Sequence, residues 1–217
     1  MKKFFVSAGL LSIAVLTSCS SDSSDNTTII EQDPVVETTE LKDPAFEQSL
    51  IDLGFDTTLD GSVLTANIEN IRDLILNDKG ITDLTGIEDF INLENLWAND
   101  NALTTLDVSN NGKLKFIFVD NNEITSLDVA NLSSLEKIGA ANNGLSSINV
   151  SGNLNLQLLV IPDNNITAID VANNSQLNSF SVVNNPLTCI KVSASRLNNI
   201  PSQWEKDEED TYAISCN

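Results

Sequence analysis

The stretch that decides the fold is LKFIFVDNNEI, residues 114–124. Its apolar residues and its second asparagine recur every 21 residues, in one phase, in five consecutive copies. The first leucine of each copy is Leu93, Leu114, Leu135, Leu156 or Leu177. The asparagine is Asn101, Asn122, Asn143, Asn164 or Asn185. A fixed period of this length predicts a coil of stacked turns, because a single turn can bury its apolar face only against its neighbours.

Within each copy, the spacing of apolar residues predicts a short strand. Ile117 and Val119 alternate with Phe116 and Phe118, so one pair faces inward and the other outward. The asparagine comes where the chain must bend away from the strand. Its amide can donate to and accept from backbone groups that the bend leaves unpaired, so we expect the five asparagines to form a structural ladder.

The pattern L-x-x-L-x-L-x-x-N-x-L is that of leucine-rich repeats. A sixth, leading copy starts at Ile71, is 22 residues long, and has Lys79 in place of the asparagine. The L-D-V-S/A-x-N stretches resemble leucine-rich-repeat lipoproteins of Flavobacteria and other Bacteroidetes, and the first turn is similar to internalin-type repeats. The resemblance implies a solenoid with short parallel strands on the concave face and extended or turn-like segments on the convex face.

The first residues read as an export signal. Lys2 and Lys3 precede an apolar stretch that is too short to span a bilayer, which is typical of a signal peptide over residues 1–18. Leu16-Thr17-Ser18-Cys19 resembles a lipoprotein cleavage box, which implies that Cys19 carries the lipid. Residues 19–42 are rich in Ser, Thr and acidic residues and predict a disordered tether. We expect the chain to be anchored in the outer membrane. A further expectation is that it is displayed on the cell surface.

A solenoid needs a cap at each end. We expect an N-terminal cap over residues 43–70, six turns over residues 71–192, and a C-terminal cap over residues 193–217. Asp43-Pro44 is a helix-start signal, and Phe46, Leu50 and Leu53 fall on one face of the helix that follows. At the other end, we expect a short helix over residues 201–206 that presents Trp204 to the last turn.

Three cysteines are present, and lipidation of Cys19 leaves Cys189 and Cys216. In an exported chain these two are expected to form a disulfide that holds the C-terminal cap. A loop of this length corresponds to roughly 3 kcal/mol in the chain-entropy model. The alternative is a redox-active pair, which the absence of a C-x-x-C motif disfavours.

The outward positions of the predicted strands carry the candidate binding site. Apolar residues that point into solvent can indicate a binding surface. Here two strands with outward aromatic residues precede a strand with an outward glycine, which would leave a hollow. The candidate ligand-binding residues are Trp97, Phe116, Phe118, Lys137, Gly139, Leu158 and Val160. The competing interpretation is that these aromatic rings only shield the sheet or pack on one another.

Charge and composition exclude several functions. The chain has 31 acidic and 11 basic residues and no histidine, a net charge of -20. This opposes binding to nucleic acid and excludes histidine-dependent catalysis and histidine metal sites. Asp78, Asp100, Asp120 and Asp163 edge the strands and make a weak calcium site conceivable, whereas a solubilising role is the simpler interpretation. We expect no cofactor and no metal.

The sequence therefore predicts a non-catalytic, lipid-anchored binding module that recognises a protein or a glycan through its concave face, and we expect a monomer. One alternative is a structural or adhesive envelope component in which charge matters more than any pocket. A polysaccharide-acting enzyme is the second alternative, because paired carboxylates can hydrolyse glycosidic bonds.

Overall fold

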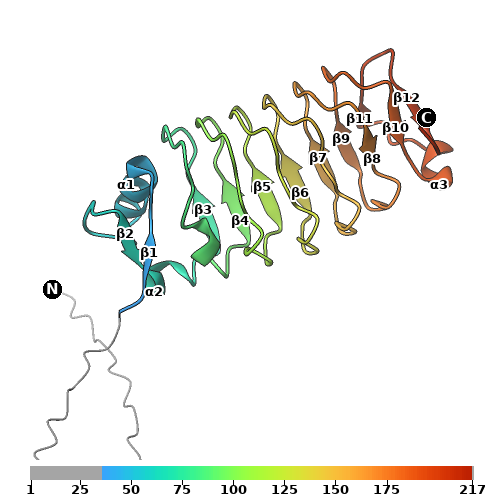
Figure 1. Ribbon diagram of the computed structural model, residues 1–217. Coiled ribbons are helices and arrows are strands. Elements are labelled where there is room, and N and C mark those ends of the chain that lie inside the picture. The colour runs from blue at the N-terminus through green and yellow to red at the C-terminus, as the bar shows by residue number, and fades with distance from the viewer. Residues whose placement is uncertain (1–35, 217) are drawn as a thin grey trace, which may run out of the picture. The chain divides into compact units, whose positions relative to one another are not determined.

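The computed structural model describes residues 36–216. Cys19, the predicted signal peptide and residues 20–35 of the predicted tether lie outside the described residues. Within the described part, the chain forms a solenoid whose turns follow one another in sequence order (Figure 1). None of the helices within residues 36–216 combines the length and apolar character that a membrane span requires.

Seven short parallel strands form the main sheet, in the order β11-β9-β7-β6-β5-β4-β3. Six of them come from the repeats: β3 (Asp73–Ile75), β4 (Asn95–Trp97), β5 (Phe116–Phe118), β6 (Lys137–Gly139), β7 (Leu158–Val160) and β9 (Ser179–Ser181). Equivalent positions pair along the sheet, so that Leu96 lies opposite Ile117 and Ile117 opposite Ile138. The period predicted from the sequence is therefore the register of the sheet.

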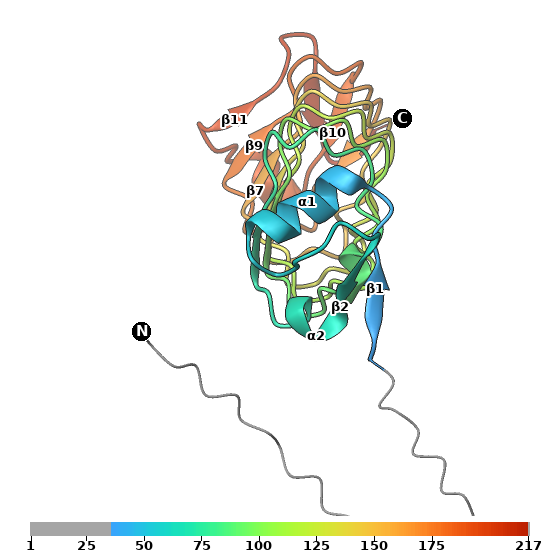
Figure 2. The same cartoon turned by 90° about the vertical axis from the view of Figure 1, so that its left-hand side faces the viewer.

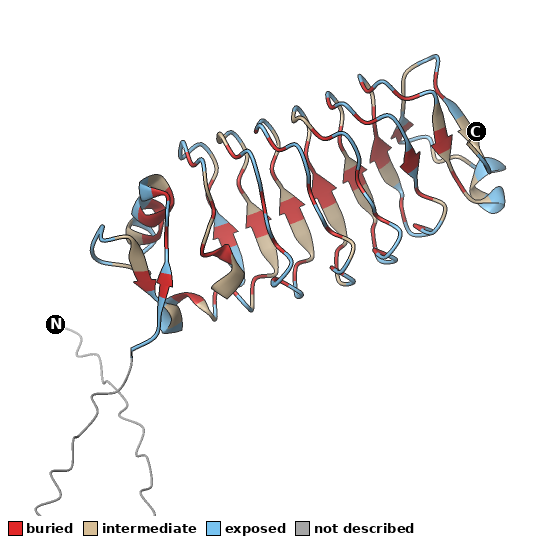
Figure 3. Cartoon of the chain, in the orientation of Figure 1, coloured by how far each residue is buried: buried red, intermediate tan, exposed pale blue. Residues whose placement is uncertain are grey.

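The opposite side of the coil is built from short, separate extended pieces. β8 (Ile169–Asp170), β10 (Cys189–Lys191) and β12 (Thr211–Ala213) form a three-stranded parallel sheet, and Leu106 and Leu127 form an isolated bridge. The first turn carries the 3-10 helix η1 (Ile87–Asp89) on this side. Between the two sides, the inward residues of every turn form one apolar core (Figure 3).

The asparagine ladder joins successive turns. Asn122 donates to the carbonyl oxygens of Ala98 (2.9 Å), one turn earlier, and Val119 (3.0 Å) in its own turn. Its Oδ1 accepts from the backbone amide of Leu103 at 3.0 Å. Asn101, Asn143, Asn164 and Asn185 repeat this arrangement. Each side chain thus supplies hydrogen bonds that the bending backbone cannot make for itself.

A second ladder, on the other side of the coil, was not predicted. Asn111, Asn153 and Asn174 are at most 1% exposed, and their amides donate to carbonyls of the preceding turn, as Asn153 does to Val129 and Leu132 at 2.9 and 2.8 Å. The signal was present in the sequence, because these asparagines also recur every 21 residues or a multiple of it. The series is interrupted at Leu132, which is buried in the apolar core instead.

A third column explains why Asn and Asp follow the strands. Asp78, Asp100, Asn121, Asn142, Asp163 and Asn184 all have positive φ angles, between 51° and 59°. Among residues with a side chain, Asn and Asp adopt this left-handed conformation most readily. Part of the column is also tied together, since Asn142 donates to Asn121 and Asn121 donates to Asp100.

The N-terminal segment contains α1 (Pro44–Asp52), α2 (Thr65–Ile68) and a two-stranded antiparallel sheet of β1 (Thr38–Glu40) and β2 (Ser62–Leu64). Asp43 starts α1 by accepting from the amides of Ala45 and Phe46, and its other oxygen accepts from Thr82 at 2.7 Å. Phe46 packs on Phe90 with ring centroids 6.1 Å apart. Viewed along the coil, α1 lies across the first turns (Figure 2).

Two expectations for this segment are wrong. The disordered tether does not extend to residue 42, because Thr38–Glu40 is strand β1, held by the hydroxyl of Thr39 donating to Asp89 at 2.6 Å. Leu53 does not share the buried face of Phe46 and Leu50. It is exposed, because the helix has already ended at Asp52 and the chain turns away at Gly54, whose φ is +82°.

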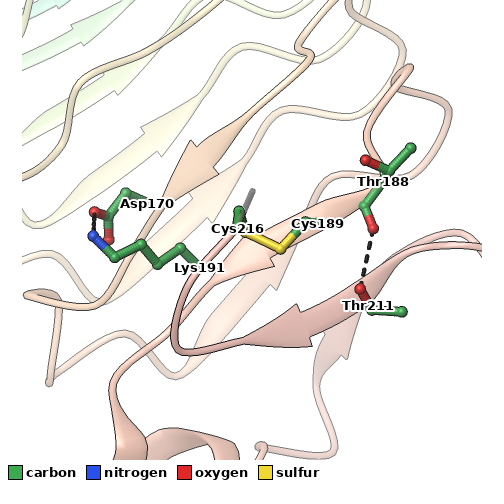
Figure 4. The surroundings of a disulfide bond; sticks show 6 residues. All are labelled: Asp170, Thr188, Cys189, Lys191, Thr211 and Cys216. Atoms are coloured by element: carbon green, nitrogen blue, oxygen red, sulfur yellow. Dashed lines mark hydrogen bonds and ion pairs between the residues drawn. A yellow bond between two sulfur atoms is a disulfide. The ribbon is translucent and has the colours of Figure 1, made fainter.

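At the C-terminal end, the predicted disulfide between Cys189 and Cys216 is confirmed, with the two Cα atoms 5.8 Å apart (Figure 4). The predicted helix over residues 201–206 is wrong. Trp204–Glu205 is β11, which pairs with β9 and adds a seventh strand, while a short helix, α3, lies earlier at Ala194–Leu197. Trp204 still covers the end of the core, 8% exposed and 4.8 Å from the Phe180 ring between centroids.

The ladder makes a quantitative prediction. Replacement of Asn122 by Ala leaves the backbone groups of two turns without partners, so we expect the free energy of unfolding to fall by about 2 kcal/mol. Asn131→Ala is the control, because that side chain is exposed and should change stability by less than about 0.5 kcal/mol. Urea unfolding monitored by circular dichroism measures both, and equal effects would contradict the role assigned to the ladder.

Candidate functional site

The outward side of the main sheet is the candidate site. We call the residues at the first and third positions of β3, β4, β5, β6, β7 and β9 the strand face. The register brings Trp97, Phe118, Gly139 and Val160 into one row and Phe116, Lys137 and Leu158 into a second. All seven predicted binding residues therefore lie side by side on β4–β7. Their side chains are partly buried, apart from Gly139, which is buried.

Trp97 and Phe118 are stacked on neighbouring strands. Their ring planes are 9° apart and their centroids 6.5 Å apart. Aromatic pairs of this kind hold each other in place while they remain partly open to solvent. Trp97 is not part of the interior, as the outward register predicted. The stack is thus a pre-formed apolar surface on the sheet.

The hollow expected above Gly139 does not exist. A Cβ at this position would lie 2.7 Å from Cδ1 of Phe118, so the ring already occupies the space that the missing side chain leaves. Gly139 therefore contributes no accessible surface, and its role is to let Phe118 lie flat across β6. The predicted cross-strand aromatic cluster and an outward aromatic surface are both present in one arrangement.

The side chain of Lys137 extends from β6 back toward β5. Its Nζ lies 4.6 Å from the centroid of the Phe116 ring, which is a cation–π distance. Among residues 36–216, no carboxylate lies within ion-pair distance of this ammonium group. Other basic side chains near the start of the strands are engaged: Arg72 and Lys115 both pair with Glu94, at 3.0 and 2.7 Å.

One apolar residue extends the site beyond the prediction. Ile75 pairs with Trp97 in the sheet and is 56% exposed, which is unusual for an isoleucine on a strand. The sequence signal was its place in the same column as Trp97 and Phe118. With Ile75 included, the apolar side chains of the strand face come from β3, β4, β5 and β7, and the Phe118 ring covers Gly139 of β6.

The carboxylates at the other end of the strands do not gather into a metal site. Within the described residues, no group of three or more Cys, Asp or Glu side chains is arranged to hold a metal ion. Asp78, Asp100 and Asp163 belong to the left-handed column, whereas Asp120 lies in the neighbouring column and accepts from the amide of Ala141 at 2.7 Å. Three carboxylates of the acidic row therefore accept hydrogen bonds from neighbouring backbone or side-chain groups: Asp100, Asp120 and Asp163.

Asp120 is partly buried at this edge of the sheet. Burial raises its pKa, the hydrogen bond from the Ala141 amide opposes that rise, and the nearby charge of Asp100 adds to it. Asn99 fills the equivalent place one turn earlier and accepts from the amide of Asp120 at 2.8 Å. A neutral side chain at this position can therefore accept the same hydrogen bond from the backbone amide of the next turn.

Comparison with known proteins supports the fold. No protein-family model matches the chain, and no curated protein matches it. Among solved structures, the functional domain of InlJ from Listeria monocytogenes, described as including a cysteine ladder, is 26% identical with a TM-score of 0.66. The match covers 83% of this chain and 44% of that domain, so the chain spans less than half of the domain's length.

Two further solved structures are more distant. A chain of the LRIM1/APL1C complex is 22% identical with a TM-score of 0.54, over 60% of this chain and 27% of that one, and shows the fold alone. Internalin C2 from Listeria monocytogenes is 20% identical over 79% of this chain and 93% of that one, with a TM-score of 0.46 that is too low to support a conclusion. The chain is thus a leucine-rich-repeat solenoid of about seven turns with internalin-type structural neighbours.

The perturbed carboxylate gives a pH-dependent prediction. Because the pKa of Asp120 is higher in the folded state, the folded state binds this proton more tightly, and stability falls as pH rises through that pKa. We expect Asp120→Asn to be more stable than the wild type at pH 7, with a difference that disappears below about pH 4. Thermal unfolding across this pH range measures the effect.

Glu123→Gln is the matched control, since it removes one negative charge from an exposed side chain of the same turn. It should leave the pH profile close to that of the wild type. A loss of stability in Asp120→Asn at pH 7 would show that the hydrogen bond to Ala141 needs the ionised carboxylate.

Proposed function

We propose that this chain is a protein-binding module that engages its partner through the strand face and does no catalysis. The observation that carries the proposal is the Trp97–Phe118 stack, a fixed aromatic surface that faces solvent. Large aromatic side chains held in place before binding lose little conformational entropy when a partner covers them, and such residues dominate binding energy at protein interfaces.

The dimensions of the apolar row favour a protein partner over a glycan. Strands of a sheet are about 4.8 Å apart, so the row from Ile75 to Val160 extends over roughly 15–20 Å. It offers several apolar contacts in line, which suits the side chains of a protein segment. A sugar ring needs one open aromatic face with polar groups around it, whereas here Trp97 and Phe118 are stacked on each other and Phe116 is covered by Lys137.

The ends of the molecule complete the proposal. The segment of residues 43–70 serves as an N-terminal cap, supported by the contact of Phe46 with Phe90 and by the hydrogen bonds of Asp43 to Thr82. Lipidation of Cys19 anchors the chain to a membrane, with the outer membrane as the proposed location, as in the lipoproteins that the N-terminal sequence resembles. Each buried methylene of an acyl chain contributes about 0.8 kcal/mol to such anchoring.

Binding is tested by Trp97→Ala. We expect the variant to fail to capture the partner that the wild-type chain captures from intact envelope, while its thermal midpoint changes by only a few degrees, because Trp97 is outside the core. Capture by the wild type should persist in 0.5 M salt, since apolar contacts are not screened whereas a charge-driven matrix contact is.

Leu154→Ala is the matched control, because Leu154 is an exposed apolar residue away from the strand face and should not be needed for capture. Retention of the partner by Trp97→Ala, or global unfolding of that variant, would contradict the proposed surface. A wild-type chain that captures a polysaccharide but no protein would assign the face to a glycan.

The anchor is tested by Cys19→Ser. This change should move the chain from the membrane fraction to the soluble fraction and abolish labelling by radioactive palmitate. The disulfide is expected to form unchanged, because it uses the other two cysteines. Palmitate labelling that survives the substitution would disprove lipidation at this residue.

A further inference from the structure

Asp210 is buried in an unusual way at the C-terminal end of the solenoid. Its residue is 2% exposed, and among the described residues no group makes a hydrogen bond of good geometry to either carboxylate oxygen. A buried carboxylate normally accepts several hydrogen bonds or pairs with a cation, because an ionised group without partners is costly to remove from water. The Asp210 side chain therefore requires a physical explanation.

Two further polar atoms next to the end of the core are also buried without a hydrogen-bond partner among the described residues. They are Nε1 of Trp204 and the hydroxyl oxygen of Tyr212. The two rings pack on each other with centroids 5.8 Å apart. Trp204 belongs to β11, the last strand of the main sheet, and Tyr212 belongs to β12, the last strand of the opposite sheet. The cluster therefore lies where both sheets end.

The charges around Asp210 oppose its ionisation. Burial raises its pKa, and the nearby carboxylates of Asp207 and Glu209 raise it further, while the backbone amide of Asp207 and the ammonium of Lys206 act in the other direction. Lys206 is itself partly committed, because it donates to the carbonyl oxygen of Asp207 at 2.8 Å.

Groups on the neighbouring elements do not supply a compensating charge. From α3, the guanidinium of Arg196 lies over the Trp204 ring, 5.2 Å from its centroid, and donates to the carbonyl of Ser175. From β12, the phenol of Tyr212 has a raised pKa, first through burial and then through the charge of Asp210. Asp207 is held in place because it accepts from the amide of Asn184 at 2.7 Å.

We propose that Asp210 is a proton-responsive latch that closes the C-terminal end of the solenoid when its carboxyl group is neutral and loosens it when the group ionises. In the neutral state, the side chain can remain buried beside Tyr212 without a counter-charge. When it ionises, hydration of the carboxylate and repulsion from Asp207 and Glu209 favour displacement of residues 206–213 from Trp204. The Cys189–Cys216 disulfide limits that displacement to a local opening.

The direction of the pH effect follows from linkage. A carboxyl group whose pKa is higher in the closed state than in the open one stabilises the closed state at low pH, and this contribution is lost as pH rises through the higher value. The latch is therefore closed under acidic conditions and weakest at neutral pH. Its opening uncovers the Trp204 side of the last strand, which is otherwise shielded by β12 and its loop.

The test uses the full chain with Trp97→Phe, which leaves Trp204 as the single tryptophan. We expect acrylamide to quench Trp204 fluorescence at least twofold more efficiently at pH 7.5 than at pH 4.5. In the same background, Asp210→Asn mimics the neutral carboxyl group and should give low quenching at both pH values. Glu208→Gln is the matched control, because it removes one charge from an exposed side chain of the same loop and should retain the pH response.

A second measurement keeps the proposal testable if a variant folds poorly. The amide of Val192 donates to the carbonyl of Ala213 at 2.8 Å, so its hydrogen-exchange protection reports the docking of β12. In the wild type, protection corrected for intrinsic exchange should be lower at pH 7.5 than at pH 4.5. An equal pH response in Asp210→Asn, or protection of Val192 that does not change with pH in the wild type, would overturn the latch.

The last part of the experiment tests calcium ions. Quenching at pH 7.5 is measured with CaCl₂ and with a chelator, in the wild-type loop and in Asp210→Asn. If the latch responds to protons alone, calcium should have no effect on either protein. Closure by calcium that requires Asp210 would overturn it and identify the carboxylate as part of a cation site.

Discussion

The hydrogen bonds of the asparagine side chains are the interaction on which the rest of the structure depends. Every turn must bend sharply after a strand of three residues, and the bend removes backbone groups from the regular ladder of the sheet. In five of the turns, one asparagine amide restores these bonds and also reaches the preceding turn, as Asn122 does through Ala98 and Leu103. These side-chain bonds support the register of the parallel sheet, which places the outward residues in straight rows.

The strand face is a consequence of those rows. Because the register is constant, residues 21 positions apart become neighbours, and Trp97 and Phe118 stack without any contribution from their local sequence. Gly139 then allows Phe118 to lie across the next strand, so the aromatic surface is flat where the sequence indicated a hollow. The solenoid therefore converts a periodic sequence into a surface whose chemistry is decided by a few non-repeating positions.

Most of the fold could be predicted, because the features that determine it are periodic. The strands and the ladder at Asn122 follow from spacing alone. The pairing of Cys189 with Cys216 follows from the number of cysteines in a chain expected to be exported. Strand β11 could not be predicted in this way, since Trp204–Glu205 carries no repeat pattern and becomes a strand only because β9 offers it an unpaired edge. The position of the Phe118 ring over Gly139 was also beyond the sequence, because the direction of an outward side chain depends on its neighbours.

The position of the last strands has a consequence for how the molecule is completed. The core beside Phe180 is covered by Trp204, and the strand that contains Trp204 is held within a loop closed by Cys216. During synthesis the N-terminal residues leave the ribosome first, so each new turn can stack on the previous one. The C-terminal end of the core nevertheless stays uncovered until the residues around Trp204 have been made. Synthesis thus leaves one apolar edge unprotected until last, and a growing chain that stalls before Trp204 presents that edge to whatever lies nearby.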